Sequence, residues 1–314
     1  MTIADKLALL EQTKEAQRVK LGLPKNLPFS QYRLYMQRWA LEDIFKNGEQ
    51  GAWLDLSDLS TIFQDMNGTA SVTKDGQPEG LILDKSQSLS TDIPLINTDA
   101  VDFKSNNWRL IGKVSEVEGN SFIASGGGAV LEGLVAGRTH KLVATISHTQ
   151  ELDIRNGSHG GAPRVILLPA SSKRTLELFF VADSTALYFR FGVTGTLTIH
   201  NIMVAEVKGN HATQSVATRR PIYRTDGKLH WSEFDGVDDT LSVQLPSGTY
   251  TEIKASRDEV THKYPVNVNG SYTLGDLTQT KQSVSGLVLV NRQLTQVEIE
   301  NITNLLKVKA GLPL

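Results

Sequence analysis

Three carboxylates stand within five positions in the sequence Glu-Phe-Asp-Gly-Val-Asp-Asp: Asp235, Asp238 and Asp239. Glycoside hydrolysis needs two carboxylates about 5–10 Å apart, one on each side of a sugar. These three share one glycine-containing turn, and the sequence identifies no second partner. A carboxylate cluster with backbone carbonyls also suits calcium. The interpretation we favour is a structural turn whose Asp side chains accept hydrogen bonds from nearby backbone N–H groups, with calcium as the alternative.

Other residue types that carry chemistry show no catalytic spacing. The seven histidines are dispersed and include no His-Glu-x-x-His pair. The glycine-rich stretch 125–130 is not followed by the Lys-Ser or Lys-Thr of a phosphate-binding loop. There is no Gly-x-Ser-x-Gly elbow, and the absence of cysteine excludes thiolate nucleophiles and zinc ribbons. We therefore expect no enzymatic activity and no cofactor.

Sugar binding is the remaining chemistry that the sequence suggests, in the region 95–205. Carbohydrate sites place aromatic rings against the apolar face of a sugar and polar side chains against its hydroxyls. The residues of these types are Trp108, Tyr188, Arg190 and Asn107, with Asn106 and Arg155 as further polar partners. Trp108 and Tyr188 fit core packing equally well, in which case the region is a spacer or an interaction domain.

The composition excludes several classes of partner. Lys and Arg number 32 against 34 Asp and Glu, so no excess of positive charge points to a nucleic acid or an anionic membrane. The N-terminal region lacks the apolar run of a signal peptide, and no segment is apolar enough to span a bilayer. We expect a protein that is made in the cytoplasm and does not insert into membranes.

The first 47 residues show helical patterns on either side of a break at Gly22, Pro24 and Pro28. The first helix has one apolar stripe, formed by Ile3, Leu7 and Leu10. The second, expected from Ser30 to a left-handed stop at Asn47-Gly48, has two apolar stripes, formed by Tyr32, Met36 and Trp39 and by Leu34, Leu41 and Phe45. Either both stripes pack on this chain, or the arm docks onto another subunit.

From Trp53 onward, short alternating runs between turn signals predict antiparallel β-sandwiches. In the run 138–149, His140, Leu142, Ala144 and Ile146 share one face. In the run 185–193, one face is expected to carry Leu187, Phe189, Phe191 and Val193. The fold class is thus mainly β, with jelly-roll-like modules, a helical arm before them and one helix at the C-terminus.

The C-terminal region predicts a strand over Gly286–Val290 and then a helix. Thr295 with Glu298 three residues later forms a capping-box pattern. The expected buried stripe is Ile299, Ile302 and Leu306, and Gly311 with Pro313 ends the helix.

Several segments resemble tailed-bacteriophage virion proteins of the tail, fibre and baseplate type. The stretch "GAWLDLSDLSTIFQDMNGTASVTKDGQPEGLILDKS" (51–86) resembles a segment that recurs in these proteins. In those relatives "LDKS" runs on into Gly-Asn-His-Ala, Arg-Pro-x-Tyr and Phe-Asp-Gly-x-Asp-Asp, which here resume only at "GNHA" from Gly209. His211 in this stretch is expected to pack against the Arg-Pro-x-Tyr segment. The strand pattern "GTLTIHNIMVAEV" and the C-terminal strand and helix are also similar to parts of these relatives.

The resemblance implies a discontinuous organisation. Residues 1–50 would be an anchoring helical arm. Residues 51–94 and 206–314 would be two parts of one concanavalin- or laminin-G-like β module, and 95–205 an inserted jelly roll similar to carbohydrate-binding modules. Between Leu241 and Leu294 there is room for only a few strands, so the outer module is expected to be a reduced lectin-like sandwich.

The same resemblance implies a function and partners. The chain would be a homo-oligomeric structural component of the virion, in contact with other virion proteins and, as a further candidate, with host surface polysaccharide. The alternatives are a head or collar decoration protein and a glycan-binding adhesin that uses the insert. A capsule depolymerase would need paired carboxylates in a groove and commonly has regular β-helix repeats, and the sequence has neither.

Overall fold

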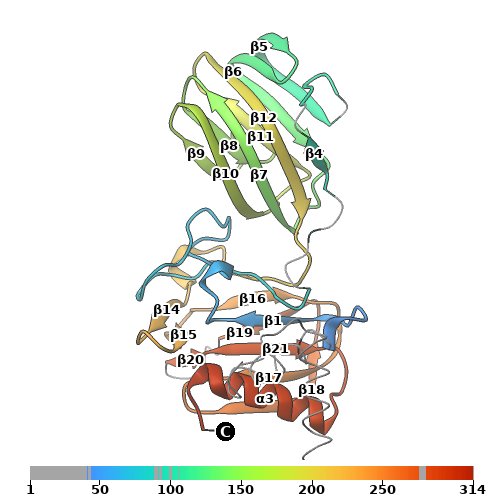
Figure 1. Ribbon diagram of the computed structural model, residues 1–314, viewed down its shortest axis with the longest axis vertical. Helices are drawn as coiled ribbons and strands as arrows, with labels where there is room; N and C mark the ends of the chain where they lie inside the picture. The colour runs from blue at the N-terminus through green and yellow to red at the C-terminus, as the bar shows by residue number, and fades with distance from the viewer. Residues whose placement is uncertain are drawn as a thin grey trace, which may run out of the picture.

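The computed structural model describes residues 41–313, apart from 42–43, 88–90, 92–93, 99–100, 106 and 276–280. Within these residues the chain is mainly antiparallel β-structure with a C-terminal helix, which confirms the predicted class. Two bodies lie end to end, an insert and a base module (Figure 1). None of the described helices is long and apolar enough to span a membrane. The residues expected to form the anchoring stripes, Ile3, Leu7, Leu10, Tyr32, Met36 and Trp39, lie outside the described part.

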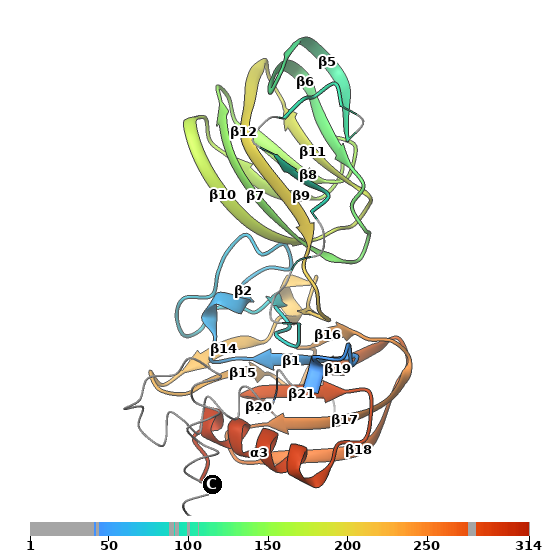
Figure 2. The same cartoon turned by 45° about the vertical axis from the view of Figure 1, so that its right-hand side comes forward.

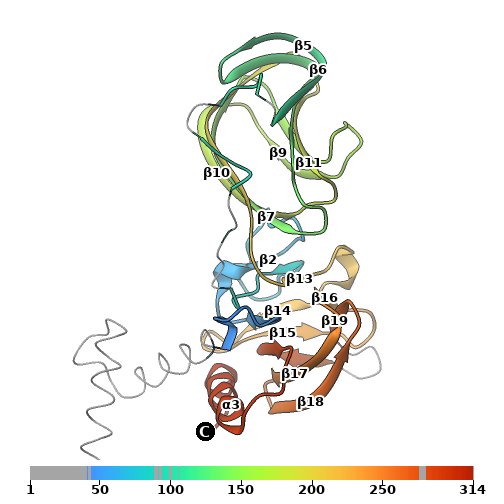
Figure 3. The same cartoon turned by 90° about the vertical axis from the view of Figure 1, so that its right-hand side faces the viewer.

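The insert is a nine-stranded antiparallel sheet folded into two curved layers (Figure 3). Its strands are β4 (Ile96–Thr98), β5 (Trp108–Glu118), β6 (Ser121–Glu132), β7 (Thr139–His148), β8 (Leu152–Asn156), β9 (Arg164–Leu168), β10 (Ser171–Val181), β11 (Ala186–Phe191) and β12 (Gly195–Glu206). The order is β10-β7-β12-β6-β11-β8-β9, with β4 on β12 and β5 on β6. Strand β6 joins the layers, because its first part pairs with β12 and its second part with β11.

Period-two alternation builds the core of the insert. His140, Leu142, Ala144 and Ile146 are all buried, as predicted for one face of β7. On β11, Leu187, Phe189 and Phe191 point into the core. The predicted fourth member of that face, Val193, is instead 60% exposed, because β11 ends at Phe191 and the chain turns. Every buried residue of this core lies between Ile96 and Val204.

The base module is a sandwich of two main sheets. A four-stranded sheet has the order β1-β21-β17-β18, with β1 (Gly51–Asp55), β17 (Gly248–Ala255), β18 (Val260–Val268) and β21 (Gly286–Val290). A five-stranded sheet has the order β19-β16-β13-β3-β2, with β2 (Ile62–Phe63), β3 (Leu81–Ile82), β13 (Ala212–Thr213), β16 (Leu241–Gln244) and β19 (Ser271–Leu274). A smaller sheet contains β14 (Ile222–Thr225), β15 (His230–Phe234) and β20 (Gln282–Val284).

Two short 3-10 turns complete the base module, η1 (Leu59–Thr61) and η2 (Ala217–Arg219). Between Leu241 and Val290 the described residues contain six strands, more than the sequence suggested. Strands β18 and β19 are mostly exposed and rich in polar residues, so they lack the apolar alternation that marks a strand in the sequence.

The helix α3 (Gln296–Ala310) covers the outer face of the four-stranded sheet. Its N-terminus is the predicted capping box: the Thr295 side chain accepts from the Glu298 N–H, and Glu298 accepts from the Thr295 N–H. Gly311 ends the helix with a φ of 74°, as predicted. Ile302 and Leu306 are buried against the sheet, whereas Ile299 is only partly buried. Leu41 and Phe45, from the end of the predicted arm, pack in the same cluster together with Ile44.

The two separated parts of the base module meet at a contact that we call the seam, formed by β3 and Asp84 on one side and by Asn210, His211 and β13 on the other. The insert leaves and re-enters the base module there. Strand β3, before the insert, pairs with β13, which follows it. The Asp84 carboxylate is fully buried and accepts from the backbone N–H groups of Trp53 (2.7 Å), Ser86 (2.8 Å) and Asn210 (2.7 Å), and from the Ser86 hydroxyl. A side chain at Gly209 could not fit, since a Cβ would stand 2.8 Å from the Asp84 Oδ2 atom.

His211 completes the seam from the other side. Its Nδ1 accepts from the Asp84 N–H at 2.9 Å, so in the neutral ring Nε2 carries the proton, which faces the Val207 carbonyl at 3.3 Å. Burial lowers the pKa of His211 to about 4, which keeps the ring neutral. The histidine thus bonds to the "LDKS" segment and to the end of the insert. It was expected to pack against the Arg-Pro-x-Tyr segment.

A second contact orients the insert on the base module. The rings of Phe63 in β2 and Phe179 in β10 lie 5.5 Å apart, and Leu81 and Leu83 complete the apolar cluster. Figure 2 shows β2 and its neighbouring loops between the two bodies. Gly68 touches the Phe179 backbone, where a Cβ would be 2.2 Å from its carbonyl oxygen.

Residues 94–207 produced alone are expected to fold, because the core of the insert takes no residue from the base module. Circular dichroism and urea unfolding should show β-structure and one cooperative transition, with a free energy of unfolding within about 5–15 kcal/mol. A chain with no cooperative transition would contradict the predicted division 51–94 plus 206–314 and 95–205.

Candidate functional site

The acidic turn after β15 is closed by its own backbone. Asp235 Oδ1 accepts from the N–H groups of Val237 (2.8 Å), Asp238 (3.1 Å) and Asp239 (3.2 Å). Asp239 Oδ2 accepts from the Asp235 N–H at 3.0 Å. The backbone hydrogen bonds, first that of Val237, lower the pKa of Asp235, whereas burial raises the pKa of Asp239. This is the geometry of an Asx-type turn.

The same three carboxylates lie close enough to share an ion, with one ligand atom from each within 4.8 Å of the others. The Asp238 carboxylate accepts no backbone hydrogen bond within the described residues and lies 3.5 Å from the Arg219 guanidinium. Calcium would have to compete with the three N–H groups that already use Asp235 Oδ1. The contacts therefore favour the structural turn, and calcium stays a prediction to be tested.

The four residues singled out for sugar binding lie on opposite faces of one sheet. Trp108 is 6% exposed and belongs to the insert core, where its ring contacts Phe103 and Phe189. Only a small part of the ring is therefore left to contact a sugar. Trp108 and Asn107 nevertheless line one cavity of about 500 Å³, together with Asp102 and Asn97, so the structure brings these two predicted residues together. Tyr188 and Arg190 point to the outer face of the sheet, opposite the core residues Leu187 and Phe189.

The outer face carries an ion cluster that the sequence did not reveal. Asp153 binds Arg155 at 2.7 Å, Arg164 at 2.9 Å and, more weakly, Arg190 at 3.5 Å. Burial opposes ionisation of Asp153, but the hydrogen bonds from Arg164 and Arg155 hold its pKa below its usual value. Tyr188, 3% exposed, packs beside this cluster with Val130 and Ala186. Arg190 therefore forms an ion pair with Asp153 and is not a free polar group for a sugar.

No sequence signal pointed to this cluster, because Asp153, Arg164 and Arg190 come from three strands. Only the register brings them together: Arg190 on β11 lies opposite Asp153 on β8, and β8 pairs with β9, which carries Arg164. Asn106, another residue considered for sugar binding, lies outside the described part.

A fully buried acid in the base module, Glu79, has the most strongly shifted pKa of the described carboxyl groups. Glu79 is 0% exposed, and its carboxyl oxygens make no hydrogen bond within the described residues. Burial raises the pKa of Glu79 to about 8, and the neighbouring Ser232 hydroxyl opposes this only in part. A pKa of about 8 makes the neutral acid the main form of Glu79 at pH 7.

Substitution of the acidic turn separates the two interpretations. We expect Asp235→Ala to lower the midpoint of thermal unfolding, in EDTA and in calcium alike, because three backbone N–H groups lose their acceptor. Asp238→Ala is the matched control and should leave the midpoint unchanged. A calcium site would behave differently, since calcium at about 100 times its Kd would stabilise the wild type by about 2.7 kcal/mol, and both variants would lose that gain.

Glu79 should make the protein less stable as the pH rises. Its folded pKa of about 8 lies above the ordinary 4.5, so the folded state holds a proton that the unfolded state releases between these values. The contribution is complete below about pH 4.5 and is lost up to about pH 8, at about 1.4 kcal/mol per pH unit. Urea unfolding of Glu79→Gln should show a slope flatter by that amount. Glu259→Gln, on the surface, is the control, and equal slopes for both variants would refute the assignment.

Comparisons with known proteins do not identify a family. No protein-family model matches the chain, and no curated protein matches it. Among solved structures, the crystal structure of AerE from Microcystis aeruginosa matches over 66% of this chain and 100% of its own, with 8% identity and a TM-score of 0.14. A similarity at this level carries no argument about fold or function.

Proposed function

We propose that the chain is a non-enzymatic structural component of a tailed-bacteriophage particle, associated with the tail, baseplate or fibre. The observation that carries the proposal is the seam. The "LDKS" and "GNHA" segments, continuous in the virion proteins that the sequence resembles, are here joined by the hydrogen bond from the Asn210 N–H to Asp84, across 126 residues of chain. This contact supports the reading of the insert as an interruption of that type of module.

The two ends of the molecule suit two different roles, attachment to the particle at one end and contact with partners at the other. The insert projects from one end of the base module, while α3 lies at the other (Figure 3). Leu41 and Phe45, which follow the proposed anchoring arm, pack in the cluster of α3. In this proposal the arm contacts neighbouring virion proteins, and the insert faces outward, toward assembly partners or the host surface. Symmetric oligomers would multiply weak contacts at the outer end.

Two alternatives use the same architecture. A head or collar decoration protein would also need an anchor and a projecting domain. A glycan-binding adhesin is favoured by the exposed position of the insert. The ring of Trp108, one of the two aromatic residues that the sequence suggested for sugar binding, is however buried.

The chain should be found in purified particles of the phage or prophage that encodes it. We expect quantitative mass spectrometry to give a copy number that matches the symmetry of a tail structure, and immunogold labelling to decorate the tail. Label on the head or collar would favour the decoration protein. Presence in the lysate but not in particles would refute the proposal.

A chain that lacks residues 1–40 should fold but fail to enter particles, since the described core begins at Leu41. Its unfolding midpoint should stay close to that of the full chain, with incorporation reduced at least about tenfold, as expected when the main anchoring contacts are lost. Normal incorporation of the shortened chain would show that the arm is not the anchor.

A further inference from the structure

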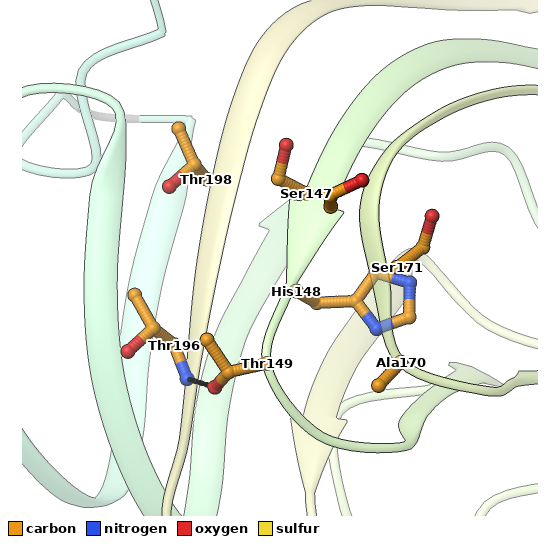
Figure 4. Close-up of a pocket in the computed structure, with 8 residues that line it drawn as sticks. Ser147, His148, Thr149, Ala170, Ser171, Thr196 and Thr198 are labelled. Atoms are coloured by element: carbon orange, nitrogen blue, oxygen red, sulfur yellow. Dashed lines mark hydrogen bonds between the residues drawn. The ribbon is translucent and has the colours of Figure 1, made fainter.

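The end of the insert farthest from the seam contains a cavity of about 470 Å³. It lies where β7 ends and where β10 and β12 begin (Figure 4). Thr196 stands ten residues before the end of β12 at Glu206, which corresponds to about 33 Å along the strand from the seam. The cavity is therefore at the outermost part of the molecule.

The lining is dominated by hydroxyl groups. Six of the eight lining residues carry one: Ser147, Thr149, Ser171, Ser172, Thr196 and Thr198. Several are already fixed by hydrogen bonds. The Ser147 hydroxyl is 2.7 Å from the His200 ring, Thr149 accepts from the Thr196 N–H at 2.9 Å, and Thr198 contacts the Ser121 hydroxyl at 3.1 Å. None of the lining residues is charged.

His148 adds an acceptor that has no partner. Its Nδ1 lies 2.8 Å from the Gln150 carbonyl, which can only accept, so Nδ1 carries the proton and Nε2 of the neutral ring holds a lone pair. Nε2 is buried and makes no hydrogen bond within the described residues. Burial lowers the pKa of His148, and the Arg174 charge adds to this, so the ring stays neutral at pH 7.

The hydroxyl lining favours a ligand that itself carries hydroxyl groups. Nε2 of His148 lies beneath the lining, so a ligand O–H reaches it only if neighbouring side chains move, and the cost of a buried acceptor without a partner favours that movement. Ser and Thr hydroxyls both donate and accept, as sugar hydroxyls do, while the threonine methyl groups and Ala170 provide small apolar contacts. The lining itself holds no charged residue, and Arg174, outside the lining, is the cation that acts on His148.

We infer that this distal cavity is a binding site for neutral hexose units of a cell-surface polysaccharide. The inference deepens the proposed function and rests on it for the location of the ligand outside the particle. Without an aromatic platform, one site should bind a single hexose with a Kd on the order of millimolar. Several copies on one particle would raise the apparent affinity.

Saturation-transfer NMR on the full-length protein with glucose, galactose and mannose tests the site directly. We expect at least one of them to bind. Thr198→Val and Ser172→Ala should each weaken binding about fivefold, because each removes one hydroxyl from the lining. Thr175→Val, on the neighbouring strand β10 but not in the lining, is the matched control and should bind as the wild type does. Ser172 is exposed, so its variant keeps the test valid should Thr198→Val fold poorly.

Titrations with purified capsular polysaccharide and with O-antigen of the host strain then distinguish the two sources of hexose. Failure of every neutral sugar to bind, or binding that both variants retain, would overturn the inference. Binding of the polyuronate alginate alone would overturn it too, and would point to the arginines around Asp153. These measurements use purified protein, so a negative result would not bear on whether the chain is present in particles, which is measured separately.

Discussion

The Asp84 carboxylate is the constraint on which the arrangement of the chain depends. A buried carboxylate is tolerated only when its oxygens are bonded, and here the donors come from its own segment, at Ser86, and from two distant segments, at Trp53 and Asn210. Each carboxylate oxygen accepts from one donor of its own segment, at Ser86, and from one donor of a distant segment, Trp53 for Oδ1 and Asn210 for Oδ2. The ends of the insert are therefore held together by an interaction that belongs to the base module. This explains how more than 100 residues can interrupt the module without disturbing its sheets.

The seam alone would leave the insert free to rotate, and the contact between Phe63 and Phe179 limits that freedom. A hydrogen-bonded hinge and an apolar contact are two separate points of attachment, so together they hold the long axis of the insert in line with the base module. The packed arm residues and the hydroxyl-lined cavity then lie at opposite ends. An elongated molecule with one end available for attachment and the other for contact is what a projecting virion component requires.

The sequence predicted those elements that depend on local chemistry. The capping box at Thr295, the left-handed stop at Gly311 and the alternation in β7 all involve residues a few positions apart. It did not predict features that depend on which strands become neighbours. For Trp108 both sugar binding and core packing stayed open, because alternation assigns a residue to a face without saying which face is covered. The hydroxyl cavity was also missed, because its members come from the ends of three strands and are ordinary residues in each.

Three buried acids show why residue type alone could not locate a site. Asp55 lies between Lys309 (2.8 Å) and Lys85 (3.0 Å), and although burial opposes its ionisation, the two cations hold its pKa far below the usual value. Asp84 has backbone and hydroxyl donors but no cation, and burial raises its pKa to about 6. Glu79 has almost no compensation, and burial raises its pKa to about 8. The order follows the strength of the partners, from cations to neutral donors to none. The turn at Asp235 looked most like a site in the sequence. In the structure, backbone N–H groups of the turn itself supply the hydrogen-bond donors for the Asp235 carboxylate.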